Sequence, residues 1–159
     1  MENIKTFVCR PYISEDLEAI LALFYNTVHA VNIQHYSPEQ IDVWAAAIVD
    51  KDKWAQSLLK NFTYVVEFEG NVVGFGDMTH EGSLEHLYVD KDFQGCGIAS
   101  LILKAIEQKA HELGHAKITT ESSITAKPFF EKQGFIVVKE QEKIVRGMSF
   151  VTYVMKKII

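Results

Sequence analysis

The sequence has little of what marks secreted, membrane-spanning or metal-binding proteins. Only two cysteines, Cys9 and Cys96, occur among 159 residues, and neither belongs to a Cys-x-x-Cys or Cys/His cluster, which disfavours a disulfide framework or a zinc site. No apolar run approaches the roughly 20 residues of a membrane-spanning helix, and the first residues lack the basic-then-apolar order of a signal peptide. We therefore expect a cytoplasmic protein with two free thiols.

Positive charge is not in excess either. Lys and Arg number 16 against 21 Asp and Glu, which gives a formal net charge of −5. Nucleic acids and anionic membranes attract the opposite sign, so neither is an expected partner. The length and a hydrophobic fraction of 48% suit one domain with a full core. No repeat, low-complexity tract or linker interrupts the chain, which predicts a single domain over residues 1–159.

Hydrophobic spacing changes near residue 60, from helical intervals of three and four to the alternation typical of strands. The resulting order of elements predicts an α/β domain in which a mixed sheet has helices on both faces. In chain order, the patterns predict a strand at 4–10, helices at 16–28, 38–48 and around 54–59, strands at 64–68, 72–78 and 83–89, a helix at 98–113, a strand at 117–120, a helix at 125–133, and strands at 135–144 and 148–156.

Local signals indicate where some of these elements begin and turn. Ser37 to Gln40 has the composition of a capping box with proline at the first helical position. Asp50 or Asp52 is the expected cap of the next helix. Gly70-Asn71 is the predicted hairpin turn, because both residues accept positive φ angles.

A glycine-rich turn lies between a predicted strand and a long predicted helix. Gly95 and Gly97 within Asp92 to Ser100 allow backbone N–H groups to converge at the positive end of the helix dipole, where a phosphate or pyrophosphate binds. The third glycine of a dinucleotide fold and the Gly-Lys-Ser/Thr of a Walker loop are both missing. A turn of this kind also occurs as a purely structural connection between a strand and a helix. The surrounding sequence therefore has to distinguish a phosphate-binding turn from a structural one.

Two motifs resemble those of the GNAT superfamily of acyl-CoA-dependent N-acyltransferases. Gln94-x-x-Gly97-x-Ala99, which follows Leu87 to Asp90, is similar to the Q/R-x-x-G-x-G/A motif, and Ala126 to Phe135 resembles Ala-x-x-Phe-Tyr-x-x-x-Gly-Phe. The order of elements agrees over essentially the whole chain. The resemblance implies a mostly antiparallel, twisted sheet of about seven strands, splayed between the fourth and fifth. It also implies transfer of the acetyl group of acetyl-CoA to a primary amine of a small molecule, by direct attack in a ternary complex.

The resemblance also implies how the coenzyme is held. The N–H groups of the glycine turn would bind its pyrophosphate, and Leu87 and Val89 would offer main-chain groups to the pantetheine arm, one amide polarising the thioester carbonyl. Ser123 stands where many relatives carry a coenzyme-contacting Asn. The basic cluster of Lys127, Lys132 and Lys139 is a candidate for binding the adenosine 3′-phosphate, with Lys127 best placed and solvated surface lysines as the alternative interpretation. The implied coenzyme-binding residues are Leu87, Tyr88, Val89, Gln94, Gly95, Cys96, Gly97, Ile98, Ala99, Ser100, Ser123, Lys127 and Phe130.

Attack by a neutral amine requires a proton acceptor, and Glu85 is the predicted base. Alternation along a strand puts Glu85 on one face with Ser83 and Leu87, whereas His86 points to the other face. A solvated strand carboxylate is the alternative interpretation of Glu85, and a packing or surface role is expected of His86. The reserve candidates are Asp77 and Glu81.

The sequence indicates less clearly which group protonates the departing thiolate. Phe130 replaces the tyrosine that serves as acid in the superfamily, and phenylalanine has no proton to give. Tyr36 is the predicted catalytic tyrosine, with Tyr88, Tyr153, water or unassisted departure of the thiolate as alternatives. The change at Phe130 also keeps open a non-catalytic module that binds or senses acyl-CoA.

The acceptor amine is expected between the first two long helices, at residues 28–37. His29, Asn32, His35 and Tyr36 supply hydrogen-bonding groups beside apolar walls, although a loop that satisfies its own backbone is the simpler interpretation. No carboxylate stands at metal-ligand spacing between the two histidines, so no metal is predicted. A protein N-acetyltransferase, a partner-binding helical surface, a monomer and a homodimer all remain open.

Overall fold

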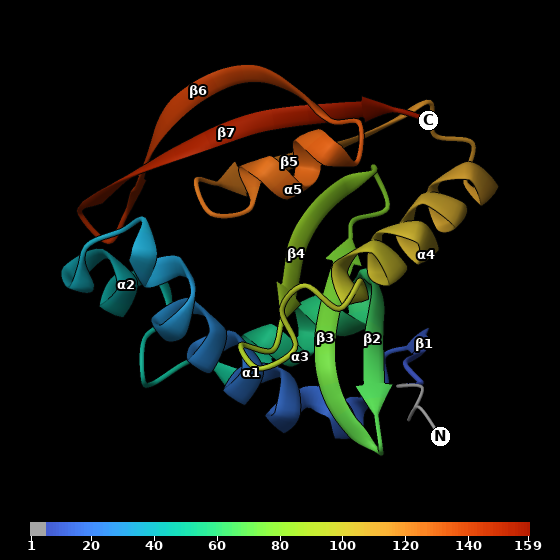
Figure 1. Ribbon diagram of the computed structural model, residues 1–159, viewed down its shortest axis with the longest axis horizontal. Helices are drawn as coiled ribbons and strands as arrows, with labels where there is room; N and C mark the ends of the chain where they lie inside the picture. The colour runs from blue at the N-terminus through green and yellow to red at the C-terminus, as the bar shows by residue number, and fades with distance from the viewer. Residues whose placement is uncertain (1–5) are drawn as a thin grey trace.

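A seven-stranded sheet runs through the computed structural model, which describes residues 6–159 (Figure 1). The strand order is β1-β2-β3-β4-β5-β7-β6, and every neighbouring pair is antiparallel except β4 and β5, which are parallel. The predicted fold class is thereby confirmed. The strands are β1 (Val8–Pro11), β2 (Phe62–Phe68), β3 (Asn71–Met78), β4 (Ser83–Val89), β5 (Lys117–Ser123), β6 (Ile136–Val145) and β7 (Met148–Ile158).

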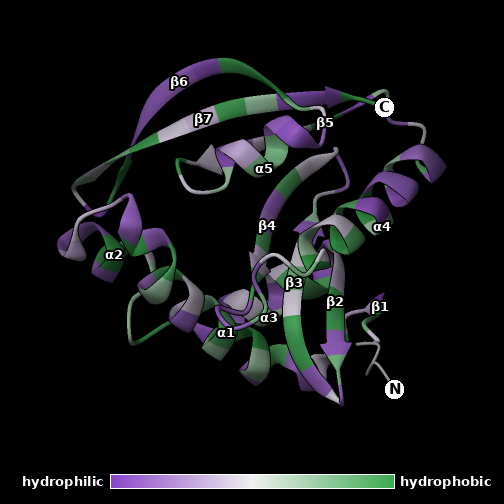
Figure 2. Cartoon of the chain, viewed as in Figure 1, coloured by the Kyte–Doolittle hydropathy of each residue, from purple (hydrophilic) through white to green (hydrophobic). Residues whose placement is uncertain are grey.

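Helices cover both faces of this sheet and bury two separate apolar clusters. On one face α4 (Ile98–Glu112) and α5 (Lys127–Lys132) pack with the strands around Ile102, Ile106 and Phe130. On the other face lie α1 (Leu17–Ala30), α2 (Pro38–Trp44) and α3 (Lys51–Lys60), which enclose Phe24, Leu58 and Phe75. Figure 2 shows hydrophobic and hydrophilic residues alternating around α4, as a helix with one buried face requires. No helix within residues 6–159 is both long and apolar enough to cross a membrane.

The two halves of the sheet separate after a short contact between β4 and β5. Only Ser83↔Thr119 and Leu84↔Thr120 are paired across these strands, and Figure 1 shows β4 diverging from the β5-β7-β6 half. A β-bulge in β4 coincides with this point, because Asp77 pairs with His86 and Met78 with Leu84, so that Glu85 has no partner on β3. The predicted splay between the fourth and fifth strands is confirmed.

Some element ends differ from the prediction. The capping box of Ser37 and Gln40 forms as expected, and Asp50 accepts the capping hydrogen bond of α3 from the Lys53 amide at 3.1 Å. The predicted end of α2 at Ile48 was wrong, since the helix stops at Trp44 and Ile48 is 89% exposed. The predicted strand start at residue 4 lies outside the described residues.

The β2–β3 turn was predicted one residue too late. Positive φ angles occur at Glu69 (51°) and Gly70 (80°), and Phe68 pairs with Asn71, so the two-residue loop is Glu69-Gly70. The hairpin also contains a β-bulge between Val66 and Glu67, which shifts the register of its two strands.

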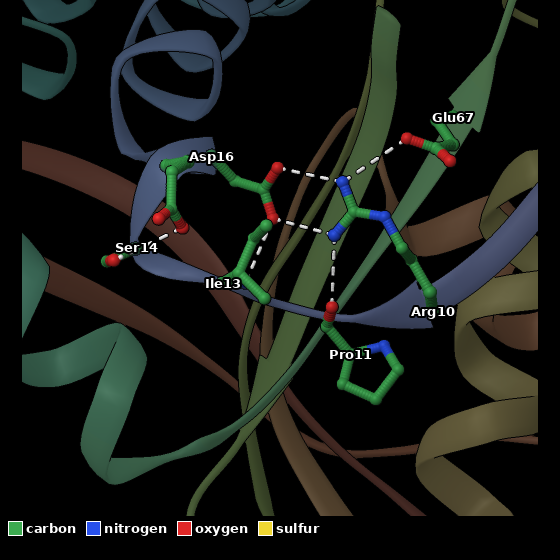
Figure 3. A network of polar contacts seen from close by, with 7 residues as sticks. Arg10, Pro11, Ile13, Ser14, Asp16 and Glu67 are labelled. Atoms are coloured by element: carbon green, nitrogen blue, oxygen red, sulfur yellow. Dashed lines mark hydrogen bonds and ion pairs between the residues drawn. The ribbon is translucent and has the colours of Figure 1, made fainter. Parts of the chain in front are cut away.

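The first strand is tied to the first helical turn by one arginine, drawn in Figure 3. Arg10 of β1 donates two hydrogen bonds to Asp16, both of 2.9 Å, and a third to Glu67 of β2 at 3.2 Å. Asp16 also accepts from the Ile13 amide. Burial by itself would raise the pKa of Asp16, but these hydrogen bonds hold it below its ordinary value. The network fixes the chain where it passes from the sheet edge into η1 (Ser14–Asp16) and α1.

Candidate active site

The glycine turn has the backbone geometry of an anion-binding nest. Gly95 and Gly97 adopt φ angles of 72° and 82°, and Gly97 is the left-handed N-cap of α4 without any side-chain cap. The amides from Gly97 to Ser100 find no acceptor among the residues that the structure describes. Four unpaired N–H groups at the start of a 15-residue helix have the geometry that suits a phosphate group.

A cleft of about 440 Å³ connects this turn with the opening between β4 and β5. Its lining includes the turn from Gln94 to Ser100 without Cys96, the strand residues from Leu84 to Val89 without His86, and Phe129, Phe130 and Lys132 of α5. The cleft therefore continues from a phosphate site into a slot between two strands. A long ligand with a phosphate at one end and an extended arm fits this shape.

The main chain of β4 faces the slot at two residues. The amide of Asp90 donates to Val73 of β3, and peptide groups alternate in direction along a strand, so Leu87 and Val89 turn their groups away from β3. The Val89 carbonyl already accepts from Thr27 at 3.0 Å and from Gln94 at 2.7 Å. The amide N–H of Val89 therefore remains available to an extended ligand in the slot.

The far wall of the cleft comes from α5 and the end of β5. Phe130 is buried and lines the cleft, packed against Phe129 and Phe135. The Ser123 hydroxyl also lines it and accepts from the Ala126 amide at 3.0 Å. The Gln133 amide group donates to the Ser100 hydroxyl at 3.1 Å and thereby joins α5 to the glycine turn.

Among the three lysines considered for the adenosine 3′-phosphate, the one that lines the cleft is not the one preferred from the sequence. Lys127 does not line the cleft, because its ammonium lies 3.6 Å from Glu131 and 4.9 Å from the centre of the Tyr153 ring. Lys132, further along α5, does line it. Cys96 is exposed at the turn without lining the cleft, and its thiol lies 3.7 Å from the Gln94 carbonyl oxygen.

A second cavity, of about 660 Å³, opens on the helix-covered side formed by α2, α3 and the β6–β7 hairpin. Six aromatic side chains line it: Phe24, Tyr36, Trp44, Trp54, Tyr88 and Phe150. Six residues line both this cavity and the cleft: Trp44, Leu84, Glu85, Tyr88, Glu121 and Ser123. The two spaces therefore meet where β4 and β5 part.

Only one of the four predicted acceptor residues lines the second cavity, and that residue is Tyr36. Asn32 is buried and lines the cleft instead. His29 stacks on Tyr25 at 4.1 Å and bonds to the Ala45 carbonyl at 2.8 Å, whereas His35 bonds to Thr125 at 2.9 Å. Both histidines lie outside the two linings. Trp54, Phe150, Lys143 and Arg146 of the second cavity were missed, since they come from segments without a recognisable motif.

The three tyrosines considered as proton donors differ in what their hydroxyls do. Tyr36 donates to the Val151 carbonyl and accepts from the Ile124 amide, both at 2.9 Å. Tyr153 donates to Glu140 at 3.1 Å. Tyr88 lines both spaces, and burial raises its pKa, which a side-chain hydrogen bond from Trp44 only partly offsets, so this hydroxyl keeps its proton at neutral pH.

The carboxylates considered as bases differ in burial and in hydrogen-bond partners. Glu85 is exposed at the bulge, where the Ser83 hydroxyl lies 3.3 Å from its carboxylate. Asp77, a reserve candidate, is fully buried, and its two oxygens accept from Asn61 at 3.0 Å and from His86 at 2.9 Å. Glu81, the other reserve candidate, is exposed and lines neither space. Residues 6–159 bring no three His, Cys, Asp or Glu side chains together in the manner of metal ligands.

A mixed sheet split next to a helix-capping glycine turn, with a cavity on each side of the split, is the arrangement that the sequence led us to expect of an acyl-CoA-dependent transferase. Comparison with known proteins makes the assignment specific. Residues 32–157 match the model of the acetyltransferase (GNAT) domain. An N-acetyltransferase of uncharacterised substrate from Escherichia coli, YafP, is 36% identical over 156 residues, which cover 98% of this chain and 97% of the relative. The chain belongs to the GNAT family and is an acetyl-CoA-dependent N-acetyltransferase.

Solved structures of N-acetyltransferases superpose on almost the whole chain. A GCN5-related N-acetyltransferase of Rhodopseudomonas palustris superposes with a TM-score of 0.93 at 26% identity, and 100% of both chains is covered. The PaiA N-acetyltransferase of Thermoplasma acidophilum, whose structure holds coenzyme A, superposes with a TM-score of 0.80 at 17% identity over 97% of this chain and 99% of that one. The likeness to the second structure concerns the fold alone.

Proposed function

We propose that this enzyme acetylates the primary amine of a small molecule with an apolar or aromatic body, by direct attack on acetyl-CoA in a ternary complex. The observation that carries the proposal is the junction of the two spaces at Leu84 and Glu85. A coenzyme in the cleft and an amine in the aromatic cavity would meet there without either having to leave its site.

The cleft suits acetyl-CoA at both of its ends. The unpaired amides from Gly97 to Ser100 match the pyrophosphate, and the groups of Leu87 and Val89 that face the slot match the amides of a pantetheine arm. When bound, acetyl-CoA supplies an activated acetyl group. An N–H of β4 at the junction would stabilise the charge that develops on the acetyl oxygen.

The positions of the thiols support direct transfer. The enzyme has two cysteines, and neither Cys9 nor Cys96 lines the cleft or the aromatic cavity. An acetyl-cysteine intermediate at the junction therefore has no nucleophile to form it. Initial rates at varied concentrations of both substrates should give intersecting reciprocal plots, whereas parallel plots would contradict a ternary complex.

The aromatic cavity supports a small acceptor rather than an extended peptide. Its six aromatic rings offer apolar walls, and its carboxylates Glu85 and Glu121 lie at the junction, where they would attract a cationic amine. The guanidinium of Arg146 and the ammonium groups of Lys53 and Lys143 lie at the same cavity. A ligand with an apolar body and an amine directed at the junction fits this distribution.

The test is acetyl transfer to a panel of amines, followed by thiol release and by mass of the product. The panel contains arylalkylamines, alkylamines, polyamines, free amino acids and peptides with free N-termini. We expect the highest kcat/KM with an amine on an apolar or aromatic body. Acetylation of peptides alone would replace this proposal with the protein-directed alternative, and coenzyme binding without turnover of any amine would contradict it.

A further inference from the structure

We propose that His86, held by the buried carboxylate of Asp77, accepts the proton of the attacking amine. The inference rests on the proposed function, because it places the amine in the aromatic cavity. His86 lines that cavity but not the coenzyme cleft. A base on the acceptor side receives the proton of the amine without competing with the coenzyme for space.

The imidazole is fixed on one side and open on the other. Its Nδ1 lies 2.9 Å from the Asp77 carboxylate, whose second oxygen accepts from the Asn61 amide group at 3.0 Å. The ring also packs against Trp54, with 4.9 Å between the centroids. The side chain is 26% exposed, and Nε2 has no hydrogen-bond partner in the part of the chain that the structure describes. Nε2 is therefore free to meet a ligand.

The aspartate determines which nitrogen carries the proton. Asp77 is 0% exposed, and a buried carboxylate is stabilised by the hydrogen bonds that it accepts. Nδ1–H donates to it, which leaves Nε2 of the neutral ring as the acceptor. An ordered chain from Asn61 through Asp77 to His86 thus presents a lone pair to the cavity. The ring geometry is that of a positioned general base.

Other charged groups share this environment and have to be separated from His86 by experiment. The carboxylates of Asp50, Glu85 and Glu121 and the cations Lys53, Lys143 and Arg146 line the same cavity. Lys143 lies 3.3 Å from Glu121. The Tyr88 ring lies 6.4 Å from the imidazole, and Phe24 and Phe75 contribute no charge. Variants of the individual groups are therefore needed to separate their effects on the pH profile.

Atoms and electrons balance in this step. The amine nitrogen forms a bond to the acetyl carbon, and the bond between that carbon and sulfur breaks, so that the sulfur leaves with its electron pair. The proton released from the nitrogen goes to Nε2 of His86 and then to solvent, and the coenzyme thiolate takes a proton from water. The products are the N-acetyl amine, the free thiol and the original imidazole.

The β-bulge explains why the Glu85 carboxylate is held less firmly than the His86 imidazole. Glu85 has no partner on β3 and lies exposed, with Ser83 as its hydrogen-bonding neighbour. His86 is in register with Asp77, so its position is defined by the sheet. The prediction that Glu85 is the base remains the competing hypothesis, and the two make different predictions for the pH dependence.

The experiment compares His86→Gln and Glu85→Gln, with Asp77→Asn as the test of positioning. The pH dependence of kcat/KM is measured with the best amine of the panel, and thiol release to water is measured without an amine. The profile is calculated on the concentration of the neutral amine, so that ionisation of the amine itself adds no acidic limb. We expect His86→Gln to lower kcat/KM at pH 7.5 by roughly 10²-fold or more and to abolish the acidic limb that remains. Glu85→Gln should keep that limb, and Asp77→Asn should reduce kcat at least tenfold with the KM for acetyl-CoA unchanged.

Two further measurements separate the failure of this inference from that of the proposed function. Calorimetry should give the same coenzyme affinity for wild type and His86→Gln, which shows that the variant is folded. Nitrogen NMR of the histidine ring in the free enzyme should show the Nδ1–H tautomer at neutral pH. An Nε2–H tautomer, or a His86→Gln variant that keeps its acidic limb and its rate within threefold, would overturn the inference. A wild-type enzyme that acetylates none of the amines would contradict the proposed function. The ring tautomer and the rate of thiol release to water would then still show whether His86 can act as a base.

Discussion

Gly97 has a backbone conformation that other residues adopt only with strain, and it adjoins the amides that we assign to the pyrophosphate. Its φ is 82°, and a Cβ there would meet no atom within 4 Å, so substitution by alanine acts through the backbone alone. We expect Gly97→Ala to lower the free energy of unfolding by about 1 kcal/mol and the affinity for coenzyme A by roughly tenfold or more. Calorimetric titration with coenzyme A measures the second effect.

Gly114 provides a matched control for Gly97. It follows the other end of α4 with a φ of 80°, and a Cβ at this position would also meet open space, yet Gly114 lines neither cavity. Gly114→Ala should therefore cost about the same stability and leave the coenzyme affinity unchanged. Equal loss of affinity in both variants would mean that strain in α4, and not the nest, weakens binding.

Tyr36 was predicted to be catalytic, and its contacts give that prediction a clear test. The hydroxyl is buried and links the Val151 carbonyl to the Ile124 amide. Burial raises the pKa of Tyr36, so it keeps the proton that it donates to Val151. We expect Tyr36→Phe to cost roughly 1 to 3 kcal/mol of stability because two buried groups lose their partner, and to change kcat less than threefold. Urea unfolding and initial rates measure both, and a roughly hundredfold slower turnover without loss of stability would show an acid role.

At the residue scale, most residues that line the cleft could be predicted from the sequence, whereas most of those that line the aromatic cavity could not. Gln94 to Ser100 is a contiguous motif whose function depends on local backbone conformation, so a short stretch contains the signal. The pair of His86 and Asp77 depends on the register of two strands and on a bulge at Glu85. Alternation predicted that His86 and Glu85 lie on opposite faces, yet both line the aromatic cavity, and nothing local indicates a buried aspartate opposite His86.

At the level of elements, the junction of β1, η1 and β2 has a stability that depends on pH. The pKa of Asp16 is lower in the folded state than in the unfolded state, so its contribution is complete above about pH 4 and is lost as the pH falls through the depressed folded value. We expect Asp16→Asn to lower the free energy of unfolding at pH 7 by about 2 kcal/mol. The variant should also lose less stability than wild type between about pH 4 and pH 2, which urea unfolding at each pH measures.

The exposed ion pair of Lys51 and Glu18 supplies the control for Asp16. Its side chains are 59% and 71% exposed, and its shortest distance is 3.1 Å. Solvent screens such a pair, so Glu18→Gln should leave the unfolding curves at pH 7 almost unchanged. If Glu18→Gln and Asp16→Asn had the same effect, general surface charge and not the Arg10 network would explain the pH dependence.

Elements with strong periodicity or a capping signal were predicted well, whereas those that end through tertiary contacts were not. The starts of α2 and α4 follow from Ser37 and from the glycine turn. The end of α2 has no stop signal, and the backbone leaves the helix at Ala45, whose side chain is buried in the apolar cluster. β5 extends to Ser123, three residues beyond the prediction, because β7 pairs with it along its whole length.

On the scale of the whole molecule, the proposed function requires the split sheet to separate recognition of the two substrates. We place the coenzyme in the cleft beside α4 and α5 and the amine in the aromatic cavity beside α2 and α3, and β4 lies between these elements (Figure 1). Changes on one side should therefore alter one substrate's binding and leave the other's intact. This independence distinguishes two adjoining sites from a single shared pocket.

Trp54 tests that independence, because it lines the aromatic cavity and not the cleft and packs against both Phe24 and His86, at 5.0 Å and 4.9 Å between ring centroids. We expect Trp54→Ala to lower kcat/KM for the amine at least tenfold, since the cavity loses a wall and the imidazole loses a packing partner. Coenzyme A at a hundredfold excess over its Kd should still stabilise the variant by about 2.7 kcal/mol, as it does wild type, since that effect depends only on binding to the folded state. Leu59→Ala on the same helix, with a side chain that is 65% exposed, should change neither quantity. Thermal unfolding with and without the coenzyme measures the comparison, and loss of the coenzyme effect in Trp54→Ala would show that the two sites are one.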